Sequence, residues 1–141
     1  MSYRSFEEVW QDITRLQDKD VFTLCRRKKN HILKVDEKGV LRYSDAGRGT
    51  CTLVDKARFE RVWTNLVQHR EFVPKGKGGW LTCACIAHLP EVEYSCKDGT
   101  LRLYLRQQNT HPFCEVKEWK RVKKYGAKEI SGNLGVKEMR R

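Results

Sequence analysis

The spacing of apolar residues predicts two amphipathic helices. Within residues 4–18, apolar side chains recur at helical intervals at Phe6, Val9, Trp10, Ile13 and Leu16. Ser5 followed by Glu8 is a capping-box pattern, which marks the start of this helix. Asp55 is a candidate N-cap for the second helix, which continues to about His69. Its apolar stripe consists of Phe59, Val62, Trp63, Leu66 and Val67.

Between these helices the period changes to that of strands. Residues 21–25 are a short apolar run, 31–35 alternate between apolar and polar, and 40–44 follow the turn sequence DEKG. Residues 50–54 indicate another strand after a glycine-bearing loop. We expect a small antiparallel sheet of three or four strands here.

The second half of the chain is divided by its prolines and glycines. The apolar run of residues 80–89 lies between FVPKGKGG and Pro90, and its Ala84, Cys85, Ala87 and His88 favour a buried helix over a strand. Residues 92–105 predict a hairpin with Asp98 and Gly99 as turn residues. A polar loop (106–112) follows, and then either a short strand leading into a basic helix or one helix beginning near Glu115. Residues 127–141 have little periodicity, and we expect a mobile basic tail.

These elements predict a single α+β domain over residues 1–126, in a chain of 141 residues with 39% hydrophobic side chains. The domain would contain an antiparallel sheet, an N-terminal helix, a central helical pair and a C-terminal β-hairpin. No apolar run of transmembrane length exists, and the acidic, amphipathic N-terminus does not resemble a signal peptide.

The charge of the chain points to a polyanionic partner. There are 29 Lys and Arg against 18 Asp and Glu, which gives a net charge of +11. The excess lies mainly in residues 21–54 and 115–141, each with a net charge of +5, whereas residues 1–20 carry −2. Such an excess attracts nucleic-acid phosphates or anionic membranes. Without a membrane segment, nucleic acid is the favoured partner, and DNA is favoured over RNA.

Six cysteines without secreted-scaffold spacing favour free thiols in a reducing cytoplasm. Cys83, Cys85, Cys96 and Cys114 could supply four zinc ligands, but C-x-C lacks the usual two-residue gap and its side chains diverge on a helix. We therefore expect buried thiols and no metal. The chain contains no P-loop or dinucleotide fingerprint, so we expect no cofactor.

Three basic segments are candidate nucleic-acid contacts. The first lies between two predicted strands and consists of Arg26, Arg27, Lys28, Lys29, Asn30 and His31. We expect its four cations to bind phosphates, and Asn30 or His31 could reach a base edge. Arg42, Tyr43 and Arg48 would extend this surface. The alternative interpretation is a solvated hairpin tip.

The second segment is the glycine-rich stretch just before residues 80–89, which contains Lys75 and Lys77 and leads to Trp80. Backbone N–H groups at the start of a helix favour anions, and the glycines let a phosphate come close to them. The third is a basic helical face formed by Lys117, Lys120, Arg121 and Lys124 near Trp119 and Tyr125. The alternatives are a flexible surface turn for the second segment and an ordinary exposed helix for the third.

The order helix, glycine-rich turn, helix and hairpin across residues 55–105 resembles the winged helix. That resemblance implies a recognition helix near Gly79–Leu89 and a wing tip at Lys97, Asp98 and Gly99. The implied recognition helix contains no Lys or Arg, so the basic loops are better candidates for DNA contact. The strand-rich first half followed by the helix with Trp63 also resembles DNA-reading modules of bacterial restriction enzymes.

Two other functions stay open. Asp98 followed by Glu115-Val116-Lys117 resembles the D…ExK pattern of PD-(D/E)xK nucleases, in which two carboxylates hold Mg²⁺ and the lysine assists the attacking water. Pro90-Glu91 could instead supply the other half of that motif. The second possibility is a small protein-interaction module that inhibits a nucleic-acid enzyme. We favour a non-catalytic binder.

Overall fold

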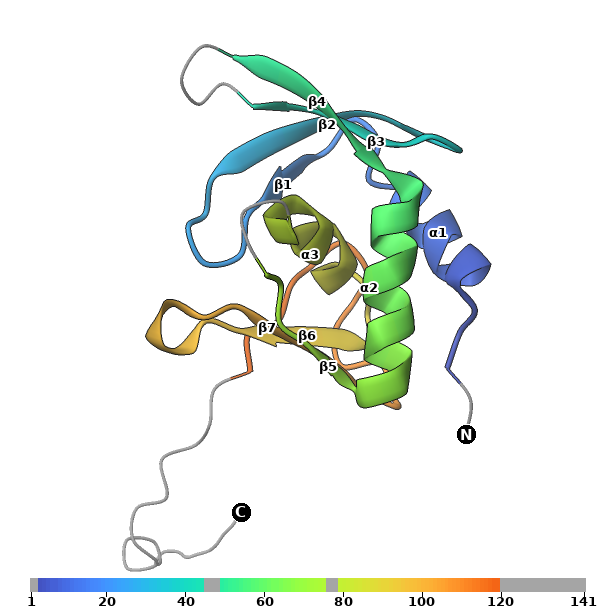
Figure 1. Ribbon diagram of the computed structural model, residues 1–141, viewed down its shortest axis with the longest axis vertical. Coiled ribbons are helices and arrows are strands. Elements are labelled where there is room, and N and C mark those ends of the chain that lie inside the picture. The colour runs from blue at the N-terminus through green and yellow to red at the C-terminus, as the bar shows by residue number, and fades with distance from the viewer. Residues whose placement is uncertain (1–2, 45–48, 76–78, 120–141) are drawn as a thin grey trace, which may run out of the picture.

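The computed structural model describes residues 3–44, 49–75 and 79–119 as a single α+β domain with two antiparallel sheets (Figure 1). The four-stranded sheet has the order β1 (Asp20–Phe22), β2 (Lys29–Asp36), β3 (Gly39–Ser44) and β4 (Thr50–Asp55). The three-stranded sheet has the order β5 (Glu71–Phe72), β7 (Arg102–Leu105) and β6 (Val92–Ser95). Among the described residues, the helices are α1 (Phe6–Thr14), α2 (Lys56–His69) and α3 (Trp80–Ala87).

Helix α3 lies in the middle of the molecule, and the other two helices lie to one side of it. Figure 1 shows α3 between the two sheets, α2 beside it, and α1 on the other side of α2. The capping box predicted for α1 is present, because the Ser5 hydroxyl accepts from the backbone N–H of Glu8 and the Glu8 carboxylate accepts from that of Ser5. All five apolar residues predicted for α1 and its end are buried, as are four of the five in α2. The two amphipathic helices are therefore confirmed.

The four-stranded sheet is confirmed, and its register assigns side chains to two faces. Ile32 pairs with Arg42, and Arg42 pairs with Thr52, so these three side chains share one face. Ile32 is fully buried, which makes this the inner face, toward α3. His31 and Tyr43 pair on the outer face. A bulge between Ile32 and Lys34 shifts the register of β2 along its length.

Helix α3 is confirmed as a core helix. Every residue from Leu81 to Leu89 is buried, so no face of this helix is available to a DNA groove. The hairpin of β6 and β7 is also confirmed. Its connection contains a short 3₁₀ turn, Lys97–Gly99, in which Asp98 and Gly99 both have positive φ.

Of the two alternatives for this segment, a single helix beginning near Glu115 is not present over the described residues 115–119. This segment instead lies along β6, where the Tyr94 N–H donates to the Lys117 carbonyl and Glu118 forms a parallel bridge with Tyr94. The free edge of β6 needs backbone partners, and this requirement outweighs the helical pattern of the basic residues.

Two cysteines depart from the expectation of free thiols. Cys25 and Cys96 form a disulfide with a Cα–Cα distance of 5.7 Å, which joins the β1–β2 loop to the end of β6. Cys83 and Cys85 are free and buried as predicted, while Cys51 is free and exposed. No helix in the described part of the chain has the length and apolar character needed to cross a membrane.

Candidate nucleic-acid interface

The β1–β2 loop presents four consecutive cations to solvent. Arg26, Arg27, Lys28 and Lys29 are all exposed. The loop is closed by Thr23, whose backbone N–H donates to the Lys28 carbonyl at 2.9 Å and whose hydroxyl accepts from the Lys28 N–H at 2.9 Å. Arg27 occupies the left-handed region with φ of 58°. The backbone is therefore held in one shape by local hydrogen bonds, while its charged side chains remain in water.

Packing fixes this loop against two other elements. The Arg26 guanidinium lies 5.8 Å from the centre of the Trp80 ring at the start of α3. The Cys25–Cys96 disulfide ties the loop to the hairpin that carries Lys97. Figure 1 shows the loop, the start of α3 and the hairpin tip on the same side of the molecule. We call Arg26, Arg27, Lys28, Lys29 and Trp80 the basic loop face.

Charge on the basic loop face is not neutralised by the described chain. Within residues 3–44, 49–75 and 79–119, none of Arg26–Lys29 forms an ion pair, although cations elsewhere such as Arg4 and Lys56 do. Exposed ammonium and guanidinium groups in this state can bind phosphates and release the counterions around them.

Asn30 does not project to solvent, contrary to the prediction that it reaches a base edge. Its side chain is 3% exposed; its amide nitrogen donates to the Lys28 carbonyl, and its oxygen accepts from Arg42 at 2.7 Å. Strand β2 begins at Lys29, so alternation turns Asn30 inward. His31 points to the outer face, where its Nδ1 lies 2.9 Å from an Asp20 carboxylate oxygen. The side chains of His31 and Asn30 therefore lie on opposite faces of the four-stranded sheet.

The other two predicted segments are described only in part. Lys75 is exposed between β5 and α3. Lys117 is exposed, and its Nζ lies 3.5 Å from a carboxylate oxygen of Glu93. The remaining predicted contacts, together with the tail of residues 127–141, lie outside the described residues: Arg48, Lys77, Lys120, Arg121 and Lys124.

The nuclease motif does not assemble as a metal site. Asp98 is exposed in the hairpin turn, where its φ of 54° reflects turn chemistry. Glu115 is exposed, and Lys117 faces Glu93. Burial acts to raise the pKa of Glu93, but hydrogen bonds from Thr110 and Arg106 outweigh this effect and lower it. The described segments contain no group of three His, Cys, Asp or Glu side chains placed to hold a metal ion.

The four cysteines considered for zinc are not grouped as a metal site within the described residues. Cys96 is used in the disulfide, and burial raises the pKa of the Cys83 and Cys85 thiols to about 12. Thiols with such a pKa are protonated at neutral pH, whereas zinc binds thiolates. The expectation of buried, inert thiols therefore holds for Cys83 and Cys85.

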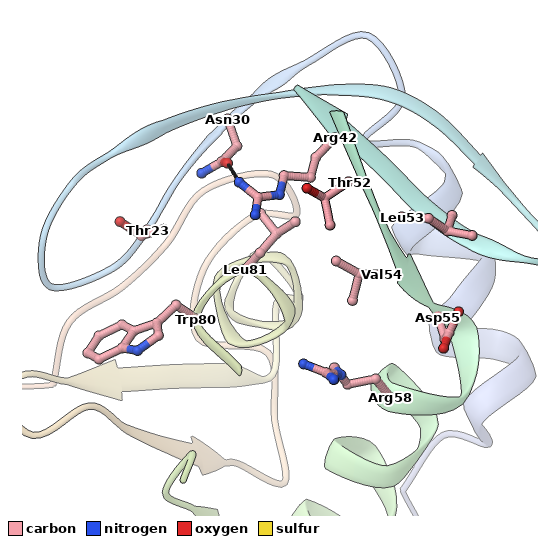
Figure 2. A pocket seen from close by; sticks show the side chains of 10 residues that line it. All are labelled: Thr23, Asn30, Arg42, Thr52, Leu53, Val54, Asp55, Arg58, Trp80 and Leu81. Atoms are coloured by element: carbon pink, nitrogen blue, oxygen red, sulfur yellow. Dashed lines mark hydrogen bonds between the residues drawn. The ribbon is translucent and has the colours of Figure 1, made fainter. Parts of the chain in front are cut away.

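A cavity that sequence reasoning missed lies between the inner face of the four-stranded sheet and α3 (Figure 2). Its volume is about 270 Å³. Two cations contribute to it, Arg42 from β3 and Arg58 from α2. Its lining consists of Thr23, Asn30, Arg42, Thr52, Leu53, Val54, Asp55, Arg58, Trp80 and Leu81. The sequence did contain one signal for this cavity. Side chains two residues apart on a strand share a face, so Arg42 points to the same inner face as buried Val40, where a charged residue is unusual.

The cavity and the basic loop face are adjacent, because Trp80 belongs to both and Thr23 begins the loop. Together they offer guanidinium groups, hydroxyl groups and an indole ring, a set suited to phosphates and nucleobases. No protein-family model, curated protein or solved structure matches this chain.

Proposed function

We propose that this protein binds nucleic acid without catalysing a reaction, with DNA favoured over RNA. The observation that carries the proposal is the exposed loop Arg26–Lys29, whose four cations pair with no carboxylate in the described part of the chain. Cations kept unpaired and close together repel one another, so a surface that holds them is suited to a polyanion.

The surroundings of the loop support the same proposal. Thr23 and Lys28 close the loop through hydrogen bonds, and the disulfide anchors it to the β6–β7 hairpin. A loop held in this way loses little conformational entropy when it meets phosphate. Trp80 lies under Arg26 and is partly exposed, so it can stack on a sugar or a base beside the phosphate contacts.

The proposal keeps the wing of the winged-helix resemblance but not its recognition helix. The hairpin tip, with exposed Lys97, would contact the DNA backbone as a wing does. Because α3 is buried, we assign the other contacts to the basic loop face and not to a recognition helix.

A salt-titrated binding assay tests the proposal. Fluorescence anisotropy with double-stranded DNA, single-stranded DNA and RNA should show log K falling steeply with log salt, with DNA bound more tightly than RNA. The double variant Arg27→Glu/Lys28→Glu should flatten the slope by roughly 0.9 for each phosphate that the loop no longer neutralises.

A matched control is the double variant Lys38→Glu/Arg61→Glu, which changes the net charge by the same amount. Lys38 is exposed on the β2–β3 turn and Arg61 is exposed on α2. Figure 1 shows both of these elements on the other side of the molecule from the β1–β2 loop. This control should keep most of the salt slope. Weak binding of all three nucleic acids with no salt dependence would overturn the proposal and favour a protein-interaction module.

A further inference from the structure

The cavity between the sheet and α3 brings two guanidinium groups to one small space. Figure 2 shows Arg42 descending from β3 and Arg58 reaching in from the first turn of α2, with Trp80 at the opposite rim. The hydroxyl-bearing residues Thr23 and Thr52 also line the cavity. Asp55 is the one carboxylate among the lining residues, so the two arginines leave the lining with a positive balance.

Arg42 is the group that most needs a partner. It occupies an inward position, where its Nη1 donates to the neutral amide oxygen of Asn30 at 2.7 Å. Its Nε is buried without a hydrogen-bond partner, and no carboxylate of the described residues forms an ion pair with it. A guanidinium has five N–H donors, and burying one of them without a hydrogen-bond partner is unfavourable.

Asn30 keeps Arg42 aimed at the cavity. The Asn30 amide nitrogen donates to the Lys28 carbonyl, which fixes the side-chain oxygen that Arg42 contacts. Asn30 is itself 3% exposed, so it cannot turn outward without leaving the core. Arg42 is therefore held in place before any ligand arrives, which lowers the entropic cost of binding an anion.

The size of the cavity restricts which anion it can take. A volume of about 270 Å³ is slightly below that of typical pockets for drug-sized ligands, and suits a group no larger than one nucleotide. A phosphate inside a strand is flanked by two sugars and cannot enter such a space. A phosphate at a chain end can enter, and it carries almost two negative charges at neutral pH.

We propose that this cavity binds the phosphate monoester of a nucleotide, either a free mononucleotide or the 5′ end of a strand. The Arg42 and Arg58 guanidinium groups would bind the phosphate, and Trp80 would contact the attached nucleoside. The strand-end source rests on the proposed nucleic-acid binding, since the basic loop face would hold the strand beside the cavity through Arg26 and Trp80.

The test compares two short single strands of the same sequence, one with a 5′-phosphate and one with a 5′-hydroxyl, each labelled at its 3′ end. Anisotropy should show the phosphorylated strand binding about tenfold more tightly, since a charge-assisted hydrogen bond is worth at least that factor. AMP should compete with it, adenosine should not, and inorganic phosphate should compete more weakly than AMP.

Variants locate the site. Arg58→Met and Arg42→Met should each abolish the preference for the 5′-phosphate. Arg61→Met, three residues along the same helix and exposed, should retain it. Circular dichroism shows whether Arg42→Met folds. If it does not, Arg58→Met and Thr52→Val test the site instead, because both residues line the cavity but are exposed, so replacing them does not disturb the core.

The outcomes separate this inference from the proposed function. Salt-dependent binding of both strands with equal affinity would overturn the cavity inference and leave the proposed function intact. Binding of AMP that depends on Arg58, without binding of any strand, would support the cavity and overturn the proposed function. A 5′-phosphate preference that survives both arginine variants would overturn the assignment to this cavity.

Discussion

His88 is an imidazole placed in the core, and it gives the fold a dependence on pH. Its side chain is 8% exposed, and its Nδ1 donates to the Ala84 carbonyl at 2.6 Å. Burial lowers the pKa of His88 below its usual value, and nearby His111 acts in the same direction, while the hydrogen bond to Ala84 partly opposes both. The folded protein therefore favours the neutral ring.

The sign of this effect follows from the unfolded chain, in which histidine takes up a proton near pH 6.5. Because the folded state binds that proton only at lower pH, the free energy of unfolding should fall as pH drops from about 7 through this window. Urea denaturation at several pH values should show this fall, and His88→Gln should flatten it. Equal pH dependence of the two proteins would contradict the prediction.

Asn30 and Arg42 show what could not be deduced for single residues. The sequence places Asn30 next to four cations, and such a segment is typical of a solvated loop. Which of these residues faces inward depends on where β2 begins and on the bulge after Ile32, and neither is visible in the hydrophobic pattern. The exposed cations Arg26–Lys29 were predicted because charge alone excludes them from the core.

At the scale of elements, sequence signals within a few residues were sufficient to predict a helix or hairpin that is stabilised by its own residues. The capping box of Ser5 and Glu8, and the turn at Asp98 and Gly99, act over a few positions and were predicted. The sequence pattern left a strand and a helix open for residues 115–119, since their conformation is set by β6, a strand more than 20 residues earlier. The Cys25–Cys96 pair, 71 residues apart, depends on the same kind of distant contact.

That disulfide should contribute measurably to stability. A cross-link that closes a loop of this length typically contributes about 2–4 kcal/mol to the free energy of unfolding. We expect Cys25→Ser/Cys96→Ser to lower the urea midpoint by a corresponding amount, with dithiothreitol having the same effect on the parent protein.

Cys51→Ser is the matched control, because Cys51 is a free, exposed thiol. It should leave the midpoint unchanged in oxidising buffer. Thiol labelling adds a second check: Cys51 should react in the native protein, whereas Cys83 and Cys85, whose pKa burial raises to about 12, should react only after unfolding. A midpoint insensitive to dithiothreitol would contradict the disulfide's stabilising role.

For the whole molecule, charge and core are separated along the chain. The buried hydrophobic residues of the described chain lie between Phe6 and Leu105. Residues 120–141, by contrast, contain eight Lys and Arg but only two Asp and Glu. The α+β class could be inferred from composition and pattern, because it is a sum over many residues. The proposed attraction to polyanions rests on the same kind of sum, the net charge. The cavity required the three-dimensional packing of β3 against α2 and α3.

This separation predicts that binding and folding respond differently to truncation. A chain ending at residue 119 should keep its free energy of unfolding, because it retains the whole described core. Its salt slope for DNA should fall by roughly 0.9 for each phosphate that residues such as Lys120, Arg121 and Lys124 neutralise. Urea denaturation and anisotropy measure the two quantities on the same protein.

A chain ending at residue 126 is the informative comparison, since it keeps Lys120, Arg121, Lys123 and Lys124 and omits four other cations. If the basic segment 117–124 contacts phosphate, this longer chain should retain most of the salt slope that the shorter one loses. If the slope of the two chains falls in proportion to their net charge, the C-terminal cations act only through the overall field, and phosphate binding belongs to the basic loop face alone. A chain ending at 119 that unfolds would show instead that the core extends beyond the described residues.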